Sequence, residues 1–267
     1  MTRLPERVPA TIRMIDKDHR FRSPGAPHEF DPFDGVLLVD KPAGPTSHDI
    51  VDMIRRRFRF DKVGHGGTLD PQATGTLIIL LGRGTKLSER FMSSDKVYEG
   101  TMRFGIATDS QDAQGKILKE SDCSSVTREQ LESAMSKFVG DIYQTPPMVS
   151  AVKVDGVPLY KRARKGQVIE RKARLIHIYE FNLLKFELPR AEFVLRCTKG
   201  VYVRTVCNDV GDILGCGAHL EKLRRLQSGS LKIEDATPVD AILHMTRDEL
   251  LKKIVPMLKF SGFGPAK

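Results

Sequence analysis

Hydrophobic and polar positions follow two different periods along this chain. Short continuous apolar runs at Gly35–Val39 and Leu77–Leu81 are typical of buried strands. Between Lys96 and Ile106 apolar and polar residues alternate, which predicts a half-buried strand. Two longer segments, 175–188 and 192–206, also predict strands, and the short turn between them favours antiparallel neighbours.

Helical spacing occurs in three other segments. Thr46 and Asp49 have the spacing of a capping box. The apolar residues that follow share one helical face: Ile50, Ile54 and Phe58. Further helices are predicted over 127–140 and 246–258. The mixed order of strands and helices predicts an α+β fold.

The composition is that of a folded protein with a basic surface. With 267 residues, 29.9 kDa and 40% hydrophobic residues, the chain can bury a core in one large domain. The net charge of +9 favours a polyanionic partner, although a basic balance alone is weak evidence for nucleic acid. The first 33 residues are rich in proline and charge without a helical or strand period, so we expect a flexible extension there.

The basic residues are clustered. The segment from Lys153 to Arg174 contains eight basic residues and only two acidic ones, and a second basic run covers 55–62. A basic run usually forms a solvated face, but two runs on either side of one candidate motif favour a surface that binds phosphates. The residues expected to contact an RNA backbone are Arg55, Arg56, Lys161, Arg162, Arg164 and Lys165.

Several functional classes are disfavoured. The four cysteines form no Cys-x-x-Cys pair and their spacing does not fit a zinc site, so we expect reduced thiols and no metal. No apolar run reaches membrane-spanning length, and the N-terminus has no hydrophobic stretch typical of a secretory signal. We therefore expect a cytoplasmic protein, or one of an organelle matrix if the basic N-terminus is a transit remnant.

The segment Gly64–Gly75, GHGGTLDPQATG, places one carboxylate in a glycine-framed loop. Glycines 64, 66 and 67 allow positive φ and close approach of another molecule, while Pro71 restricts Asp70 to extended geometry. A bare Asp-Pro pair would usually be a turn at the end of a strand. The length of the surrounding pattern favours a catalytic interpretation instead.

This segment resembles the signature of the TruB-type pseudouridine synthases, which reads roughly Gly-His-x-Gly-x-Leu-Asp-Pro-x-Ala-Thr-Gly. Three more segments extend the resemblance: 41–47, 196–205 and 215–229. The departures are Thr198 and Val201, where the family has Ser and Thr. The resemblance covers about Asp34 to Gly229. It implies the pseudouridine synthase fold, a central mixed but mainly antiparallel sheet flanked by helices and loops.

The resemblance also implies roles for individual residues. Asp70 matches the catalytic aspartate, and Arg204 matches the arginine that pairs with it and would keep it ionised by lowering its pKa. The other matched positions surround the substrate: Lys41, His65, Tyr98, Tyr202 and Leu223. The tyrosines would border the flipped base, the histidine would fill the space that the base leaves, the leucine would wall the pocket, and the lysine would support the loop. Without the motifs, each of these residues has an ordinary structural explanation.

The implied activity is conversion of uridine 55 in the T-loop of tRNA to pseudouridine, by base flipping and rearrangement of the glycosidic bond. Because the reaction involves no net redox change or hydrolysis, no cofactor is expected. The route stays open among attack at C1′, glycal formation and addition at C6. We further expect a catalytic domain over 34–235, a short helical tail over 236–267 and a monomer. That tail is too short for the PUA-type domain of many members, since a globular domain needs about 50 residues.

Three alternatives remain open. The first is a non-catalytic module that binds or folds RNA, against which the retained Asp70 argues. The second is a guide-RNA-dependent relative of the dyskerin type. The third is a glycoside or nucleoside hydrolase, which would usually need a second carboxylate, with Asp40 and Asp109 as candidates.

Overall fold

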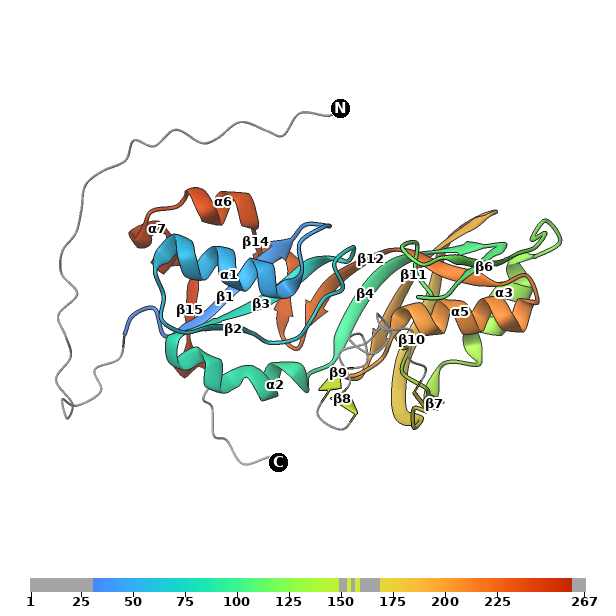
Figure 1. The fold of residues 1–267 in the computed structure, drawn as a ribbon, viewed down its shortest axis with the longest axis horizontal. Coiled ribbons are helices and arrows are strands. Elements are labelled where there is room, and N and C mark those ends of the chain that lie inside the picture. The colour runs from blue at the N-terminus through green and yellow to red at the C-terminus, as the bar shows by residue number, and fades with distance from the viewer. Residues whose placement is uncertain (1–30, 149–152, 155–156, 159–168, 261–267) are drawn as a thin grey trace. The chain divides into compact units, whose positions relative to one another are not determined.

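The computed structural model describes residues 31–148, 153–154, 157–158 and 169–260. Most strands of this part form one eleven-stranded sheet (Figure 1). Its main path runs β14 (Thr237–Pro238), β1 (Gly35–Lys41), β3 (Thr74–Leu81), β12 (Ala218–Ser228), β4 (Lys96–Phe104), β11 (Arg190–Cys197), β10 (Arg174–Glu187) and β7 (Gly140–Gln144). Off this path, β15 (Ile254–Pro256) pairs with β1, β13 (Leu231–Lys232) with β12, and β2 (Val63–His65) with β3.

The sheet is mixed but mainly antiparallel, as expected. Within the described strands, the parallel pairs of the sheet are β1 with β14 and β3 with β12. The β3–β12 pair matters for function because it places Arg224 opposite Thr74 and Arg225 opposite Gly75, directly after the Asp70 loop. On its other side β12 pairs with β4, so that Arg225 also lies opposite Tyr98.

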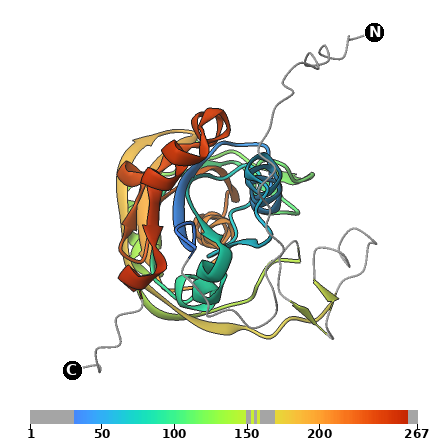
Figure 2. The ribbon, with the colours of Figure 1, turned by 90° about the vertical axis from the view of Figure 1, so that its left-hand side faces the viewer.

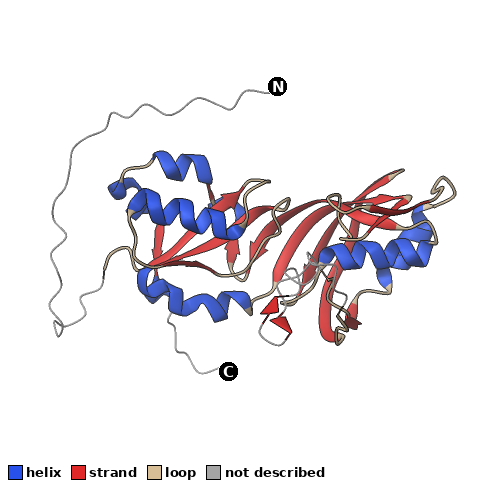
Figure 3. Cartoon of the chain, viewed as in Figure 1, coloured by secondary structure: helices blue, strands red, loops and turns tan. Residues whose placement is uncertain are grey.

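Helices flank the sheet at two places (Figure 3). Near β1 and β3 lie α1 (Ser47–Phe58), α6 (Val239–His244) and α7 (Arg247–Lys253), and near β10 and β12 lie α3 (Arg128–Ser136) and α5 (Val203–Leu214). The 3-10 helix η1 (Gly82–Leu87) leads into α2 (Ser88–Met92). The remaining elements are the hairpins β5 (Ile106–Thr108) with β6 (Ile117–Glu120) and β8 (Lys153–Val154) with β9 (Val157–Pro158), and the 3-10 helices η2 (Ile233–Asp235) and η3 (Met257–Phe260).

The start of α1 is joined to the Asp70 loop. Thr46 accepts a hydrogen bond from the Asp49 N–H, and the Asp49 carboxylate accepts one from the Thr46 N–H, so the predicted capping box is confirmed. Ser47 Oγ accepts from the Leu69 N–H at 2.9 Å and donates to the Leu69 carbonyl at 3.1 Å. The capping box thus fixes the helix end that holds the residue before Asp70.

Two apolar clusters pack on the same face of the sheet, one under α1 and α6 and the other under α3 and α5. In the view turned by 90°, α1 and α5 lie beside the curved sheet (Figure 2). Tyr98 and Leu223 are packed against both clusters. Tyr98 and Leu223, two of the residues expected at the site, therefore lie at the junction of two packed cores, which suits a site that must hold its geometry.

Some predicted boundaries are wrong. The strand expected over 192–206 ends at Cys197, because a turn with Gly200 at φ +82° follows, and residues 203–214 form α5. The buried residues of this helix recur at helical spacing: Val203, Val206, Cys207 and Val210. In addition, α3 ends at Ser136 and α7 at Lys253. The segment after 236 contains α6 and α7 but also β14 and β15, which add to the sheet beside β1.

Candidate active site

The Asp70 loop joins β2 to β3 at the middle of the sheet. Of the three glycines expected to allow positive φ, only Gly67 has it, at +139°, and Gly75 adds a second position at +100°. A Cβ at Gly75 would lie 2.3 Å from the Arg225 carbonyl oxygen, and one at Gly66 would lie 2.6 Å from the Cβ of Phe91. The glycines therefore serve close packing of the loop as much as backbone conformation.

Lys41 holds the loop from the end of β1. Its side chain is fully buried, and Nζ donates to the carbonyl oxygens of Pro42 at 2.9 Å, Pro71 at 2.9 Å and Ala73 at 2.8 Å. Burial lowers the pKa of Lys41 to about 8, with Asp70 opposing the shift. These contacts agree with the expected supporting role. The side chain binds backbone carbonyls inside the protein and presents no exposed surface to a substrate.

Arg225 holds the same loop from β12. The residue is 1% exposed, and its guanidinium donates to the carbonyl oxygens of Thr76 at 2.7 Å, Thr68 at 3.2 Å and Gly67 at 3.2 Å. Sequence reasoning missed this residue, although it lies in the matched segment 215–229. An arginine in an alternating strand gives no signal that its side chain is buried.

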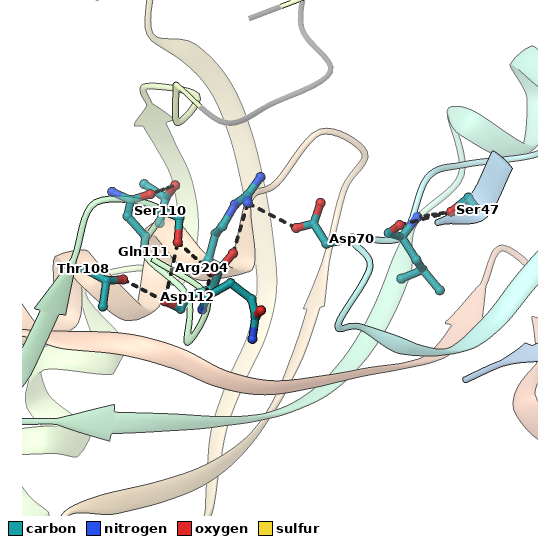
Figure 4. A network of polar contacts seen from close by, with 10 residues as sticks. Ser47, Asp70, Thr108, Ser110, Gln111, Asp112 and Arg204 are labelled. Atoms are coloured by element: carbon teal, nitrogen blue, oxygen red, sulfur yellow. Dashed lines mark hydrogen bonds and ion pairs between the residues drawn. The ribbon is translucent and has the colours of Figure 1, made fainter. Parts of the chain in front are cut away.

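The Asp70 carboxylate points toward Arg204, which lies in the first turn of α5 (Figure 4). Arg204 Nη1 is 3.4 Å from Asp70 Oδ2 and 3.3 Å from Asp112 Oδ2. The arginine side chain is only 4% exposed, while that of Asp70 is 47% exposed. One buried cation thus bridges two carboxylates, and the expected pairing of Asp70 with Arg204 is seen directly.

Asp112 is held by its own loop. Its Oδ1 accepts from Ser110 Oγ at 2.6 Å and from the Gln114 N–H at 3.0 Å, and its carbonyl accepts from Thr108 Oγ1 at 2.8 Å (Figure 4). This second carboxylate was also missed from the sequence. It lies in a loop remote in sequence from every matched motif, so only the fold brings it to Arg204.

The electrostatics of Asp70 differ from expectation. Desolvation raises the pKa of the Asp70 carboxyl above its ordinary value, Arg204 lowers it, and Asp112 raises it again. The arginine acts in the expected direction, but the net shift is upward because enclosure by the site outweighs its attraction. The pH at which Asp70 ionises is therefore set by the site as a whole.

A cavity of about 350 Å³ opens beside Asp70. Tyr98, Tyr202, Arg204 and Leu223 line it together with Asp70. The Arg204 guanidinium lies 5.7 Å from the centre of the Tyr202 ring. The structure thus brings five of the sequence-predicted residues to one hollow that offers a carboxylate, two aromatic rings and an apolar wall.

A second hollow of about 560 Å³ shares Asp70 and Leu223 with the first and is also lined by Asp112. Asp70 therefore stands where two concave surfaces meet. Such a position suits a group that must reach one nucleotide while the flanking chain lies alongside it.

Lys96 is a further buried cation of the first cavity. Its residue is 6% exposed, and Nζ donates to the carbonyl oxygens of Phe91 at 3.1 Å and Met92 at 3.0 Å, at the end of α2. Burial lowers the pKa of Lys96 to about 8. It was not predicted, because a lysine at the start of a strand is usually exposed.

Other predicted residues lie elsewhere. His65 is half-buried on β2, where Nδ1 accepts from the Gly67 N–H at 3.3 Å, and it is not among the lining residues of either hollow. Arg55 and Arg56 are exposed in the last turn of α1, opposite to the end that touches the loop. Residues Lys161, Arg162, Arg164 and Lys165 lie outside the described residues.

The carboxylates considered for a hydrolase have other partners. Asp40 Oδ2 pairs with Arg224 at 2.8 Å, and Asp109 Oδ1 accepts from the Lys116 N–H at 2.8 Å. Within the described residues, no group of three or more His, Cys, Asp or Glu side chains is arranged to hold a metal ion. No helix in the described part of the chain is long and apolar enough to cross a membrane.

The sequence is similar to known proteins along most of its length. The sequence model of the TruB family pseudouridylate synthase N-terminal domain matches residues 55–203, and that of the tRNA pseudouridylate synthase B C-terminal domain matches 204–258. A protein of Opitutus terrae named tRNA pseudouridine synthase B is 51% identical over 224 residues, covering 84% of this chain and 93% of that protein. One of the same name from Syntrophotalea carbinolica is 46% identical over 228 residues, covering 84% and 74%.

A solved structure has the same fold. A chain of a Cbf5-Nop10-Gar1 complex superposes with a TM-score of 0.67 at 30% identity, covering 85% of this chain and 61% of that one. The mixed, mainly antiparallel sheet with flanking helices is thus that of a pseudouridine synthase. With its aspartate, arginine and tyrosines gathered at one cavity, and with the family domain matched over 55–203, the chain belongs to the TruB family of pseudouridine synthases.

Proposed function

We propose that this protein converts uridine to pseudouridine in tRNA, at the T-loop uridine of position 55. The observation that carries the proposal is the Asp70 carboxylate, held by Arg204 at the edge of a cavity lined by Tyr98 and Tyr202. The names of the relatives supply the tRNA substrate. The T-loop position rests on the resemblance of the motifs. A tRNA substrate also favours action in the cytoplasm, and because every residue that lines the cavity beside Asp70 comes from one chain, we propose a monomer.

The chemistry requires a nucleotide that has left its stack, and extrusion costs least in an unpaired RNA loop. An extruded uracil would lie between the tyrosine rings and Leu223, with its sugar toward Asp70. The N1–C1′ bond then breaks, the base turns, C5 bonds to C1′, and the proton displaced from C5 is balanced by one gained at N1. A carboxylate can stabilise the positive charge that develops at C1′, or bond to that carbon.

Arg204 supports this role by its position. Its planar guanidinium lies beside Asp70, and this contact favours the ionised carboxylate against the desolvation of the site. Asp112 fixes the arginine from the other side. The residues present thus provide a charged carboxylate, its counter-ion and a stacking site without another group.

The test is release of tritium from unmodified tRNA that carries 5-tritiated uridine, with no other protein or RNA present. The wild type should release one equivalent per tRNA, mapped to the T-loop uridine. Asp70→Asn should release none and still bind tRNA with similar affinity. Asp248→Asn, which changes an exposed carboxylate at the start of α7, is the matched control and should be fully active.

The same assay separates the alternative functions. Tight tRNA binding without turnover by the wild type would favour a non-catalytic RNA-binding module. Turnover that appears only with an added guide RNA and partner proteins would favour a guide-dependent enzyme. Release of free uracil would show hydrolysis and contradict the proposed isomerisation.

A further inference from the structure

Arg225 is a buried cation whose partners are carbonyl groups. Its residue is 1% exposed, and in the described part of the chain no ion pair joins it to a carboxylate. Its guanidinium donates three hydrogen bonds, to the backbone oxygens of Gly67, Thr68 and Thr76. Burying a charge without a counter-ion is costly even when it is hydrogen-bonded, so this arginine is poorly explained by stability alone.

The acceptors of Arg225 lie on both sides of Asp70 in the sequence. Gly67 and Thr68 precede the aspartate, and Thr76 follows it on β3. Lys41 binds Pro71 and Ala73 between them, so that two buried cations hold the entire loop. Ser47 holds Leu69, directly before Asp70, and Arg225 adds the contacts to Gly67 and Thr68 that Lys41 and Ser47 do not make.

The backbone of Arg225 is fitted to the loop as closely as its side chain. Gly75 lies opposite it in the parallel β3–β12 pair, and a Cβ there would come within 2.3 Å of the Arg225 oxygen. In the β12–β4 pair the same residue lies opposite Tyr98. Arg225 thus contacts the loop that carries the carboxylate and the strand that carries a base-bordering ring.

We infer that Arg225 is a positioning residue, whose forked guanidinium fixes the Asp70 loop at the distance from Tyr98 that the reaction needs. This inference rests on the proposed function for its reaction and on the hydrogen bonds for its geometry. A planar fork reaches several acceptors at fixed angles, which a lysine ammonium on a flexible stem does not reproduce. Since a displacement of 1 Å in an active site can cost a factor of about 100 in rate, loss of the fork should reduce turnover strongly.

The first experiment measures single-turnover rates at saturating tRNA for the wild type, Arg225→Met and Arg225→Lys, at a temperature where circular dichroism shows all three folded. Both variants should lose about 100-fold in rate. Their tRNA dissociation constants should stay within about threefold of the wild type, which corresponds to under 1 kcal/mol. If Arg225→Met does not fold, Arg225→Gln, which keeps two neutral N–H donors, takes its place in the same comparison.

Arg247→Met is the matched control. Arg247 also donates to a backbone carbonyl, that of Phe58, and lies over the rings of Phe33 and Phe60, away from the Asp70 loop. Its loss should lower the melting temperature and leave the single-turnover rate unchanged. Equal rate losses in both methionine variants would show a general structural effect and overturn the inference.

A second readout does not depend on catalysis. Amide hydrogen exchange in residues 66–73 should become at least about tenfold faster in Arg225→Met, as expected for a locally opened loop, and remain unchanged in Arg247→Met. Unchanged exchange in Arg225→Met, or a full wild-type rate in Arg225→Lys, would overturn the positioning role. If the wild type fails to turn over tRNA but the exchange result holds, the proposed substrate is wrong, while the conclusion that Arg225 holds the Asp70 loop stands.

Discussion

At the scale of single residues, one guanidinium serves two carboxylates. Arg204 is almost completely buried between Asp70 and Asp112, at 3.4 and 3.3 Å. The two carboxylates therefore repel each other across a shared cation, and Asp112 raises the pKa of Asp70 while Arg204 lowers it. Asp112 thus fixes the arginine at the expense of a higher pKa for Asp70.

Replacement of Asp112 by asparagine tests this balance. The proposed reaction needs an ionised Asp70, so the single-turnover rate should fall as pH falls through the pKa of Asp70. Removal of the Asp112 charge lowers that pKa. The acid limb should therefore move to lower pH. The plateau rate should also drop by about tenfold, because Arg204 loses a charged partner.

The control for this variant is Asp109→Asn, which changes a carboxylate of the same loop that bonds the Lys116 N–H. It should leave the acid limb in place. An acid limb that stays fixed or moves to higher pH in Asp112→Asn would contradict the assigned coupling between the two carboxylates.

How much of the site could be predicted depended on whether the family resemblance assigns a role to the residue. It assigns roles to Asp70, Arg204, Tyr98 and Tyr202, and the structure gathers these four at one cavity. Asp112 was not predictable, since its approach to Arg204 depends on a loop and a helix 92 positions apart. A buried cation such as Arg225 leaves no mark in a strand pattern.

At the scale of elements, the ends of strands and helices hold the loop. The end of β1 supplies Lys41, the start of α1 supplies Ser47, and β12 supplies Arg225. Each contact joins a side chain of one element to the loop backbone. The loop therefore needs no secondary structure of its own to be held in place.

Lys41 gives this arrangement a pH dependence on the alkaline side. Its pKa is lowered to about 8, so the lysine loses a proton as pH rises through that value. A neutral amine has two N–H donors for the three carbonyls that it now binds, and the loop should loosen. Between about pH 8 and the ordinary pKa of lysine, Lys41 is protonated in the unfolded chain but largely neutral in the folded protein. The unfolded chain therefore binds more protons than the folded protein, and the contribution of Lys41 to folding stability rises with pH. We therefore expect turnover, and not stability, to fall severalfold above about pH 8.

The pH profile of Lys41→Met provides the measurement. Its single-turnover rate should be low at every pH and should lack the alkaline limb of the wild type. Lys96→Arg is the control, because Lys96 has a similar pKa of about 8 but binds the end of α2. If the alkaline limb persists in Lys41→Met and is lost in Lys96→Arg, the limb comes from Lys96 and not from Lys41, which would contradict the prediction.

Element prediction succeeded where one period ran uninterrupted and failed where two periods met. The helix after Thr46 and the strand from Lys96 were predictable from capping and alternation. The end of β11 was not, because the apolar residues of 192–206 continue from a strand into α5 and only the Gly200 turn separates them. The C-terminal strands are two or three residues long and acquire their pairing from β1, which local sequence does not encode.

At the scale of the whole molecule, the basic run at 55–62 does not lie where sequence order suggested. Arg55 and Arg56 precede the Asp70 loop in sequence, yet they lie in the last turn of α1, and nine residues of helix place Arg56 about 13 Å along the axis from Ser47. Arg55 and Arg56 line neither of the two hollows beside Asp70, whereas two exposed lysines lie at these hollows. Lys222 lines the larger hollow, and Lys199 lies between two residues that line the smaller one.

These positions predict how tRNA affinity responds to salt. A lysine that neutralises a phosphate releases counterions, so its removal should reduce the slope of log Kd against log salt concentration by about 1. Lys199→Ser with Lys222→Ser should therefore flatten the slope by about 2 in the Asp70→Asn background, where no turnover disturbs binding. Lys252→Ser with Lys253→Ser removes the same charge from α7 and should change the slope little. Equal flattening by both pairs would mean that net charge, and not a phosphate path along the hollows, sets the affinity.

The same measurement on Arg55 with Arg56, and on Lys161 with Arg162 and Arg164, tests the two stretches that sequence order favoured.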